Sequence, residues 1–587
     1  MRLKINRSAK PGDGYAYIVE NYRDQAGKPT CRIVEKLGRV SQLQAADNGW
    51  RAKAEARAVE LTAAKSTTRG RLVYDLAEPA GPIGAVNAGW LLADAGFGQL
   101  GLSSWLRRRR RDKGWAVDVE AVLRLLVTSR IVWPGSKRAT VAKADRLWAG
   151  PVVSLEETYR ALDHLCAESA RIQARARAAL AGLGEELQCV FYDVTNYFFE
   201  IDRPDAPGLD HAPARGQASR RRGWSKEHRQ TPIIQMGLFM DQDGMPVSYR
   251  LFHGSTPDAA TLRGAVSEFK GCFGGPKVTV VADGAMNNQA NLAMLDGAGD
   301  GWVLAASIRK TTKRLRAWVL DEAGWSHQMD ASGRIAAMTK SMIQTRTITY
   351  TTSDGVKARR QITEKVIAHW SWAYAAREAA TRAEMAAKAV ALVGDPAGFK
   401  ASNRRGVKKY VKTVQVDPAT GQLGGVEEVL SLDEARLAAD AELDGYWLVH
   451  TSQVDTPDQV VLGQYRQLWR IEETFRVSKT DLDARPVYVW KPAHVEAHFL
   501  VCFLALVITR LLQRHAGGLP SGQLRELLTG LVVTEAGDGV YLAGRPAGWD
   551  VVDQATGVDT NHKWVDAAGL RAWRRQWAAK LAEHPPT

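Results

Sequence analysis

The sequence predicts an α/β fold built on a mixed sheet whose central strands carry acidic residues. Residues 188–196 are mostly apolar and aromatic and contain one carboxylate, Asp193, and a second apolar run, residues 277–282, ends at Asp283. Between them, two strand-like segments flank the turn Asp-Gln-Asp-Gly, which is typical of a β-hairpin. Residues 465–479 instead place apolar side chains at helical spacing. These patterns predict a core of strands and helices with carboxylates near the strand ends.

Length and charge restrict the classes of protein that fit this sequence. With 587 residues, of which 45% are hydrophobic, the chain can bury a large core and is expected to divide into several domains. Its 79 Lys and Arg residues exceed its 64 Asp and Glu residues, which leaves a formal charge of +15. A strongly basic protein favours a polyanionic partner, so nucleic acid is the first candidate, although ribosomal and membrane-surface proteins share this balance.

Cysteine usage and the N-terminal segment indicate the cytoplasm. The five cysteines lie far apart and form no C-x2-C pair, so neither a zinc site nor a disulfide framework is indicated. The segment MRLKINRSAK lacks an apolar stretch, and the longest membrane candidate, residues 499–508, has about half of the roughly twenty residues that span a bilayer. We therefore expect a cytoplasmic, nucleoid-associated protein with no membrane partner.

The first 184 residues are expected to form a small β-structure followed by helices. Two alternating segments on either side of a Gly- and Pro-containing turn predict a β-hairpin in residues 1–40. Residues 41–184 carry several segments with helical periodicity, one of which begins with a capping box of Ser154 and Glu157. This helical region contains five consecutive arginines, Arg107 to Arg111, which either bind DNA or form a solvated face.

The order of the elements that follow is the succession expected of a ribonuclease H-like fold. A strand with Asp193, the hairpin, a helix and the strand that ends at Asp283 predict the first part of a catalytic core in residues 185–309. Far more residues separate Asp283 from Glu472 than one strand and one helix require, so residues 310–443 are expected to form a β-rich inserted subdomain. The core is expected to resume in residues 444–515, followed by a C-terminal region, residues 516–587, as a candidate for dimerisation.

A carboxylate stands on the apolar face of the helix predicted over residues 465–479. At 100° per residue one narrow stripe contains five side chains, Tyr465, Leu468, Glu472, Phe475 and Lys479. A carboxylate on a core-facing stripe is costly unless a cation or a bound metal ion compensates it. The alternative is a salt bridge on the helix surface between Glu472 and Arg476, which are four residues apart.

The spacing Tyr-x2-Leu-x3-Glu-x6-Lys resembles the Y-R-E-K signature of bacterial insertion-sequence transposases of the DDE class, in particular insertion-sequence family four and its close relatives. The chain departs from this signature at Leu468, where the family has Arg. Residues 191–200, FYDVTNYFFE, resemble the strand that carries the first aspartate in that family, and residues 223–226 are similar to another of its blocks. The resemblance is close over about residues 185–310 and 445–510.

The resemblance implies that Asp193, Asp283 and Glu472 are catalytic carboxylates that hold two Mg²⁺ or Mn²⁺ ions. It implies a DNA transposase that cleaves at the ends of its element and joins the strands to target DNA. The expected partners are double-stranded DNA, both the terminal inverted repeats and the target, and a second copy of the chain in a homodimeric synaptic complex. The residues expected to contact DNA are Tyr465, Arg476, Lys479, Lys226 and Arg470.

Two other functions fit part of the sequence. A tyrosine recombinase would use Tyr465 as its nucleophile, but it requires a His-x-x-Arg element, and none of the twelve histidines is followed by Arg at that spacing. A catalytically inactive, transposase-derived DNA-binding protein would keep the basic regions without needing three carboxylates. The presence of all three favours an enzyme, and metal-dependent cleavage of DNA carrying the element ends would separate these alternatives.

Overall fold

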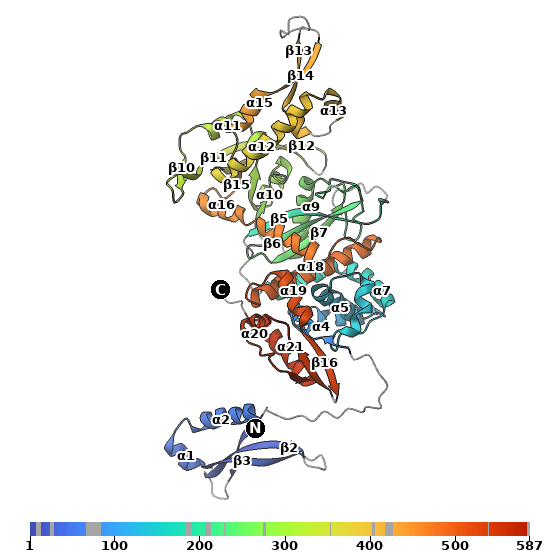
Figure 1. Cartoon of the computed structure of the whole chain (residues 1–587), viewed down its shortest axis with the longest axis vertical. Helices are drawn as coiled ribbons and strands as arrows, with labels where there is room; N and C mark the ends of the chain where they lie inside the picture. The colour runs from blue at the N-terminus through green and yellow to red at the C-terminus, as the bar shows by residue number, and fades with distance from the viewer. Residues whose placement is uncertain are drawn as a thin grey trace. The chain divides into compact units, whose positions relative to one another are not determined.

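In the computed structural model the chain divides into two compact units (Figure 1). One unit contains Met1–Gly81 with Ala536–Asp538, and the other contains Pro82–Glu535 with Gly539–Thr587. The structure describes residues 1–7, 13–23, 29–65, 84–181, 187, 189–205, 213–227, 229–273, 277–352, 354–401, 405–416, 427–537 and 539–583. Because the two units are separate bodies, each is described by itself.

The N-terminal unit is a three-stranded antiparallel sheet with two helices. Its elements are β1 (Arg2–Arg7), β2 (Gly14–Arg23), β3 (Pro29–Arg39), α1 (Val40–Ala46) and α2 (Trp50–Lys65). Trp50 and Ala54 are buried with Ala16, and the partly buried Leu3 packs against them. The predicted hairpin corresponds to β2 and β3, whereas β1 was not predicted. Its pattern was weak because only Leu3 and Ile5 alternate with polar residues, and Ile5 is exposed.

A nine-stranded sheet forms the centre of the second unit, in the order β10-β11-β12-β15-β9-β8-β5-β6-β7. Its first five strands in the chain, with the helices between them, are β5 (Cys189–Phe198), β6 (Ile233–Asp241), β7 (Pro246–His253), α9 (Asp258–Phe273), β8 (Thr279–Ala282), α10 (Gln289–Gly297) and β9 (Gly301–Ala306). β5 is antiparallel to β6 and parallel to β8, which is parallel to β9. The predicted succession of strand, hairpin, helix and strand is therefore present.

The segment predicted to be a separate insertion contributes strands to the same sheet. The elements that follow β9 are α11 (Lys313–Leu320), β10 (Ser326–Met329), β11 (Ile335–Thr351), β12 (Lys357–Ser371), α12 (Trp372–Val393), α13 (Pro396–Ala401), α14 (Arg405–Lys408), β13 (Val411–Val416), β14 (Glu427–Leu432), α15 (Glu434–Ala441) and β15 (Tyr446–Thr451). β12 pairs with β15, which pairs with β9. Because Ile367 and Ala368 of β12 are fully buried on opposite faces of the sheet, β12 continues the core. β13 and β14 form their own two-stranded sheet.

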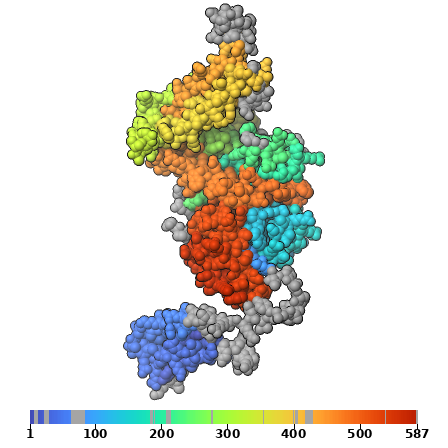
Figure 2. All heavy atoms as spheres, viewed as in Figure 1, coloured from blue at the N-terminus to red at the C-terminus, as the bar shows by residue number. Residues whose placement is uncertain are grey.

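Helices from both ends of the second unit pack into one helical body. They are α3 (Trp90–Gln99), α4 (Ser103–Lys113), α5 (Val119–Val132), α6 (Lys137–Ala142), α7 (Leu155–Ala167), α8 (Ser169–Leu180), α18 (Pro492–His515), α19 (Ser521–Gly530), α20 (Asp550–Thr556) and α21 (Ala567–Leu581). Figure 2 shows the red C-terminal residues beside the cyan residues that precede β5, in agreement with the packing of α19 on α5. In the same body α21 packs on α3 and α18 packs on α7. The predicted capping box of Ser154 and Glu157 is present.

The C-terminal region, for which the sequence predicted no elements, adds a small sheet to this body. Its strands are β16 (Val532–Gly537), β17 (Val540–Gly544) and β18 (Trp564–Asp566), and β16 pairs with β4 (Val86–Asn87) from the start of the unit. The order of the sheet is β18-β17-β16-β4. The region is therefore bound to the helical body through residues that lie more than 400 positions earlier in the chain.

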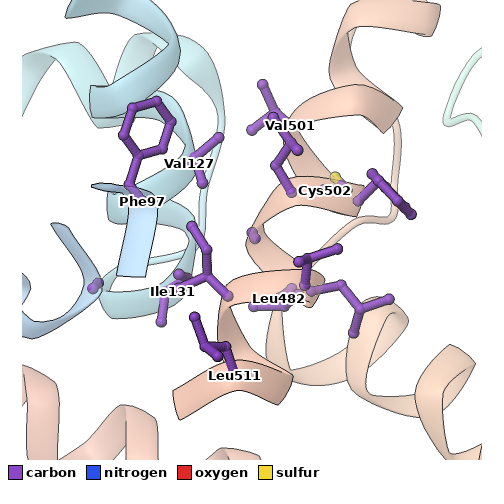
Figure 3. Packing of buried hydrophobic residues seen from close by; sticks show 14 of the residues in the cluster. Phe97, Val127, Ile131, Leu482, Val501, Cys502 and Leu511 are labelled. Carbon is purple, nitrogen blue, oxygen red and sulfur yellow. The ribbon is translucent and has the colours of Figure 1, made fainter. Parts of the chain in front are cut away.

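α18 is the central helix of the helical body. By length and composition it is the one helix within the described residues that could cross a membrane, but 94% of its most apolar window is buried in the fold. Figure 3 shows Phe97 of α3 and Val127 and Ile131 of α5 on the side that faces Val501 and Leu511 of α18. Its apolar composition is therefore explained by its position in the core.

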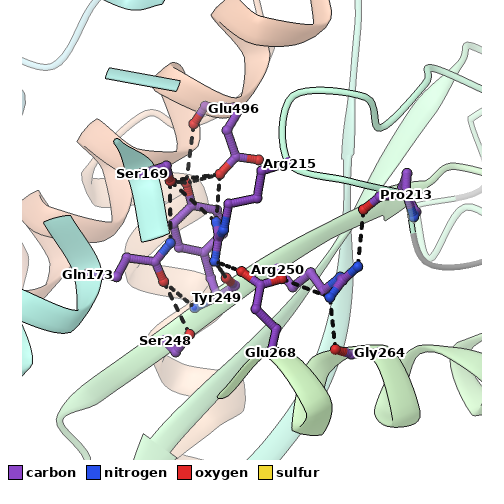
Figure 4. Close-up of polar contacts among 10 residues, drawn as sticks. All are labelled: Ser169, Gln173, Pro213, Arg215, Ser248, Tyr249, Arg250, Gly264, Glu268 and Glu496. Carbon is purple, nitrogen blue, oxygen red and sulfur yellow. Dashed lines mark hydrogen bonds and ion pairs between the residues drawn. The ribbon is translucent and has the colours of Figure 1, made fainter. Parts of the chain in front are cut away.

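A buried polar cluster joins the helical body to the central sheet (Figure 4). Glu496 of α18 accepts hydrogen bonds from the Tyr249 hydroxyl of β7 at 2.8 Å and from Ser169 of α8 at 2.9 Å. Arg215 donates to the same Glu496 oxygen at 2.7 Å and forms a second ion pair with Glu268 of α9. Removing one partner would leave an uncompensated buried charge, so this cluster fixes α18 against β7.

The helix predicted over residues 465–479 is interrupted. α16 (Asp458–Arg466) ends before α17 (Trp469–Arg476), and a wider π-helical turn, Val477–Asp481, follows. The amides of Leu468 and Ile471 bond to carbonyls three residues earlier, at 3.1 Å each, which tightens the backbone between the two helices. The prediction of one continuous stripe was therefore wrong, because it assumed 100° for every residue.

Candidate active site

Asp193 of β5 and Asp283, which directly follows β8, occupy neighbouring positions. Tyr192 of β5 pairs with Ala282, the last residue of the parallel strand β8, and the next residue in each segment is an aspartate. Side chains alternate between the two faces of a sheet. Tyr192 and Ala282 pack in the cluster that includes α9 and α10, whereas Phe191 packs in the cluster that includes α17 and α18. Asp193 has the same parity as Phe191, so its side chain faces the α17 side of the sheet.

Asp193 is largely withdrawn from solvent and surrounded by charge. Burial raises the pKa of Asp193 to about 6; the charges of Asp283 and Asp258 contribute to the rise, while Lys226 and the amide of Val194 oppose it. Asp193 Oδ1 accepts a hydrogen bond from the Val194 amide at 2.7 Å. Lys226 Nζ donates to the Val194 carbonyl at 2.6 Å. The ammonium group of Lys226 is thereby held beside the first aspartate.

Asp258 is a fourth carboxylate of this group that the sequence pattern did not single out. It is the first residue of α9. Burial raises the pKa of Asp258, Asp283 adds to the rise and Lys226 opposes it, so Asp258 shares both neighbours with Asp193. Its signal in the sequence was the turn Gly-Ser-Thr-Pro-Asp between the hairpin and α9, which places an acidic residue in the first turn of a helix that follows a core strand.

Glu472 is carried toward these aspartates by α17. This helix packs against β5 through its buried face, which includes Phe475, and leaves Glu472 exposed. Burial raises the pKa of the Tyr465 phenol to about 12. The negative charges of Asp283, Glu472 and Asp193 add to this rise. Tyr465 is thus within electrostatic range of all three predicted carboxylates, which come from two strands and a helix.

Glu473 lies next to Glu472 in sequence but has a different environment. Its carboxylate pairs with Arg476 at 3.9 Å and with Arg510 of α18 at 3.3 Å. Arg510 also donates to the hydroxyl of Thr474 at 2.7 Å. Glu472 has no ion pair within the described residues, so the alternative salt bridge between Glu472 and Arg476 is not formed. The ion pair of Glu473 with Arg510 holds α17 against α18. The carboxylate of Glu472 remains available to bind a cation.

The carboxylate group suits a hard divalent cation by its donor chemistry. Asp193, Asp283 and Glu472 supply oxygen ligands alone, as Mg²⁺ and Mn²⁺ prefer. Within the described residues, however, no three His, Cys, Asp or Glu side chains are already grouped so that they could hold a metal ion. Asp193 and Asp283 each accept a hydrogen bond from a nearby backbone amide instead, of Val194 and Ala285.

The five residues expected to contact DNA have different environments. Tyr465 and Lys226 lie close to the carboxylates described above and interact with their charges. Arg470 donates to the carbonyl of Gln242 in the β6–β7 turn at 3.0 Å, which stabilises the hairpin. Arg476 is mostly exposed. Lys479, expected to be free for DNA, is instead nearly buried, and its Nζ lies 3.0 Å from Glu227.

The arginine run of α4 is largely engaged in internal ion pairs. Three of its members pair with acidic side chains, as Arg107–Glu120, Arg109–Glu168 and Arg110–Asp118. Arg108 and Arg111 are exposed, and neither forms an ion pair within the part of the chain that the structure describes. Three of the five arginines are therefore paired within the protein, and Arg108 and Arg111 are free for a polyanion.

A basic α/β chain that places one aspartate within a central strand, beside a second aspartate at the end of the neighbouring parallel strand, has the features of an enzyme that acts on nucleic acid. Comparison with known families identifies which one. The family described as the transposase DDE domain matches residues 201–508, more than half of the sequence, and the chain belongs to this family. The IS1634 family transposase N-terminal domain matches residues 3–68. The protein is an insertion-sequence transposase, an enzyme of metal-dependent DNA cleavage and strand transfer.

The matched ranges also bear on the finer predictions. Asp283 and Glu472 lie within the match to the DDE domain, whereas Asp193 precedes it. The N-terminal match names the IS1634 family, and the predicted membership of insertion-sequence family four is not confirmed.

Comparison with curated proteins and solved structures adds little. No curated protein matches the chain. Among solved structures, the piggyBac transposase synaptic complex with hairpin DNA is similar over 89% of this chain and 82% of that one, with 7% identity and a TM-score of 0.29. A likeness at this level decides neither fold nor site.

Proposed function

We propose that Asp193, Asp283 and Glu472 are the catalytic carboxylates of this transposase and its ligands for Mg²⁺ or Mn²⁺. The observation that carries the proposal is the parallel register of β5 and β8, because the pair of Tyr192 and Ala282 is followed on both chain segments by an aspartate. The raised pKa of Tyr465, to which the charges of Asp283, Glu472 and Asp193 contribute, supports it.

We further propose that β5 to β9 form a ribonuclease H-like catalytic core. The order β7-β6-β5-β8-β9, with antiparallel pairing on one side of β5 and parallel pairing on the other, supports this assignment. Tyr465, Glu472 and Lys479 would then correspond to the Y-R-E-K signature. Leu468 packs against the main hydrophobic cluster, so its position serves packing and supplies no substitute for the signature Arg.

The side chains around Asp193 suggest how the site handles charge and protons. When bound, two divalent ions would stabilise the attacking and leaving oxygens of an in-line phosphoryl transfer. Asp193 must be deprotonated to serve as a ligand, and Lys226 favours its ionised form. Tyr465 stays protonated at neutral pH because its pKa is raised, so its hydroxyl can donate a hydrogen bond to a phosphate oxygen. Asp258 adds negative charge that strengthens attraction for a cation.

Neither alternative function is favoured. A recombinase nucleophile at Tyr465 would need a lowered pKa, whereas burial and the surrounding carboxylates raise it. A transposase-derived protein without activity would bind DNA but not cut it. Incubating the purified chain with DNA carrying both element ends and Mg²⁺ tests this, with Asp283→Asn as the paired variant. Cleavage and strand transfer by the wild type alone support the proposal, and binding without cleavage by both proteins overturns it.

We propose double-stranded DNA, with both terminal inverted repeats and a target, as the substrate, and a homodimer as the synaptic form. The charge of +15 and the two unpaired arginines of α4 support DNA binding. Measuring the mass of the complex with element-end duplexes tests the dimer, because two ends cleaved together require one catalytic site for each end.

A further inference from the structure

One carboxylate, Glu227, lies between two cations close to the candidate active site. Its Oε1 accepts from Lys479 Nζ at 3.0 Å and from Arg485 Nη1. The side chain of Lys479 is only 10% exposed, and those of Glu227 and Arg485 are each 26% exposed. The cations lie near the rings of Tyr197 and Phe198 on β5. Two donors from the turn and loop after α17 therefore converge on a single oxygen beside β5.

A third cation lies close to this group. Lys226 precedes Glu227 in sequence and is held at the Val194 carbonyl, where its charge lowers the pKa of Asp193. Burial lowers the pKa of Lys479; Glu227 opposes this effect, and Arg485 and Lys226 lower the pKa further. The other oxygen of Glu227, Oε2, is buried and has no hydrogen-bond partner among the residues that the structure describes. Glu227 therefore compensates the charges of Lys479 and Arg485 through one oxygen, while its second oxygen lacks a hydrogen-bond donor.

We propose that Lys479 and Arg485 form a binding site for a backbone phosphate of DNA, which Glu227 occupies as an internal carboxylate until the phosphate displaces it. The proposal rests on the function proposed above. A phosphodiester offers the same paired oxygens to a guanidinium fork and an ammonium group as a carboxylate does. The phosphodiester can also accept hydrogen bonds from further donors, whereas the buried Oε2 of Glu227 has no donor among the described residues.

The exchange would link DNA binding to the catalytic strand. Lys226 and Glu227 are consecutive residues of one loop, and Lys226 is anchored at β5 next to Asp193. A phosphate seated between Lys479 and Arg485 would therefore lie beside the strand that carries the first carboxylate. In the absence of DNA, Glu227 would compete for the cations and lower the apparent affinity for any polyanion.

The test is DNA binding by Glu227→Gln in the absence of metal ions, with a duplex carrying one element end as the probe. Asp202→Asn is the matched control, because it removes one acidic charge from the same region, where Asp202 pairs with Arg222 at 2.7 Å on the surface. We expect Glu227→Gln to bind about tenfold more tightly than the wild type, and its dependence of log K on log salt to steepen by about 1. Asp202→Asn should change affinity less than about twofold.

Two further variants identify the cause of a change in affinity. In the double variant Glu227→Gln with Lys479→Gln the gain should disappear, since the freed cation is gone. Arg485→Gln alone should weaken binding and flatten the salt dependence by about 1, which gives a readout even where Glu227→Gln does not fold.

The outcomes separate this inference from the function on which it rests. A Glu227→Gln variant that folds but binds no more tightly than Asp202→Asn, or a gain that survives in the double variant, overturns the exchange while leaving DNA binding intact. An unchanged salt dependence in Arg485→Gln also overturns it. A wild-type chain that fails to bind the element end at all overturns the proposed function as well.

Discussion

Replacing Asp193 by Asn should stabilise the metal-free protein near neutral pH while it abolishes cleavage. An Asp in an unfolded chain titrates near pH 4, whereas burial and its neighbours raise the pKa of Asp193 to about 6. Between these values the folded state binds more protons than the unfolded state, so the free energy of unfolding falls as the pH rises. Above about pH 6 the full cost is present, and Asn, which cannot ionise, avoids it.

The size of the effect follows from the two titration points. A pKa that is about 2 higher in the folded chain corresponds to about 3 kcal/mol at most, since each unit is worth about 1.4 kcal/mol. Relaxation and water penetration reduce this, so we expect Asp193→Asn to raise the free energy of unfolding by about 1–3 kcal/mol at about pH 7.5. At about pH 4, where Asp193 is protonated in the folded state and about half protonated in the unfolded state, the difference should be small.

Urea unfolding of the metal-free protein at these two pH values provides the measurement. Asp283→Asn is the matched control: Asp283 is exposed, so loss of its charge should change stability by less than about 0.5 kcal/mol. Mg²⁺ at ten times its dissociation constant should stabilise the wild type by about 1.4 kcal/mol and stabilise both variants less.

Two results would refute this reasoning. If Asp193→Asn is no more stable than the wild type at neutral pH, or shows the same difference at both pH values, the carboxylate of Asp193 carries no ionisation cost in the fold. If Mg²⁺ stabilises Asp193→Asn as strongly as the wild type, Asp193 is not a metal ligand.

Three other predictions address neighbouring groups. Glu472→Gln should lower Mg²⁺-dependent cleavage by at least about 10³-fold, or about 4 kcal/mol, whereas Glu473→Gln should keep activity and lose about 0.5–1 kcal/mol of stability in urea unfolding; the reverse pattern would move the ligand by one residue. Asp258→Asn should shift the acidic limb of the pH–rate profile to lower pH, because a charge that raises the pKa of Asp193 is removed, and an unmoved limb would exclude this coupling. Arg108→Ala combined with Arg111→Ala should reduce the salt dependence of DNA binding by about 2, and an unchanged slope would mean that neither contacts phosphate.

The positions of the two aspartates could be predicted because strand periodicity carries that information. An apolar run bounded by turns specifies a buried strand, and a parallel pair reached through a helix sets the following residues of both strands at one edge. Asp193 and Asp283 required no more than this. Glu472 could be placed on the correct helix, since its neighbours Ile471 and Phe475 define the buried side.

The rest depends on contacts that no local pattern encodes. The tight backbone around Leu468 ends one helix and begins another, although every residue there is compatible with a continuous helix. β11 and β12 extend the central sheet because β12 pairs with the edge of β15, a strand about 80 residues later in the chain. Glu227 and Arg485 reach the site through tertiary packing, and as single charged residues they are indistinguishable from solvated ones in sequence.

The different environments of Glu472 and Glu473 explain how an exposed carboxylate, here proposed as a ligand, can be held in a defined position. Glu473 is tied to Arg510, whose guanidinium also holds Thr474, and Arg510 belongs to the same α18 that Glu496 fixes against β7. α17 is therefore clamped to the helix that forms the core of the helical body. Glu472 can remain free of ion pairs and still occupy a defined position, because the ion pairs of Glu473 with Arg476 and Arg510 hold this part of α17 in place. Loss of the Arg510 contacts should accordingly impair cleavage through the position of Glu472, even though Arg510 contacts no carboxylate of the proposed triad.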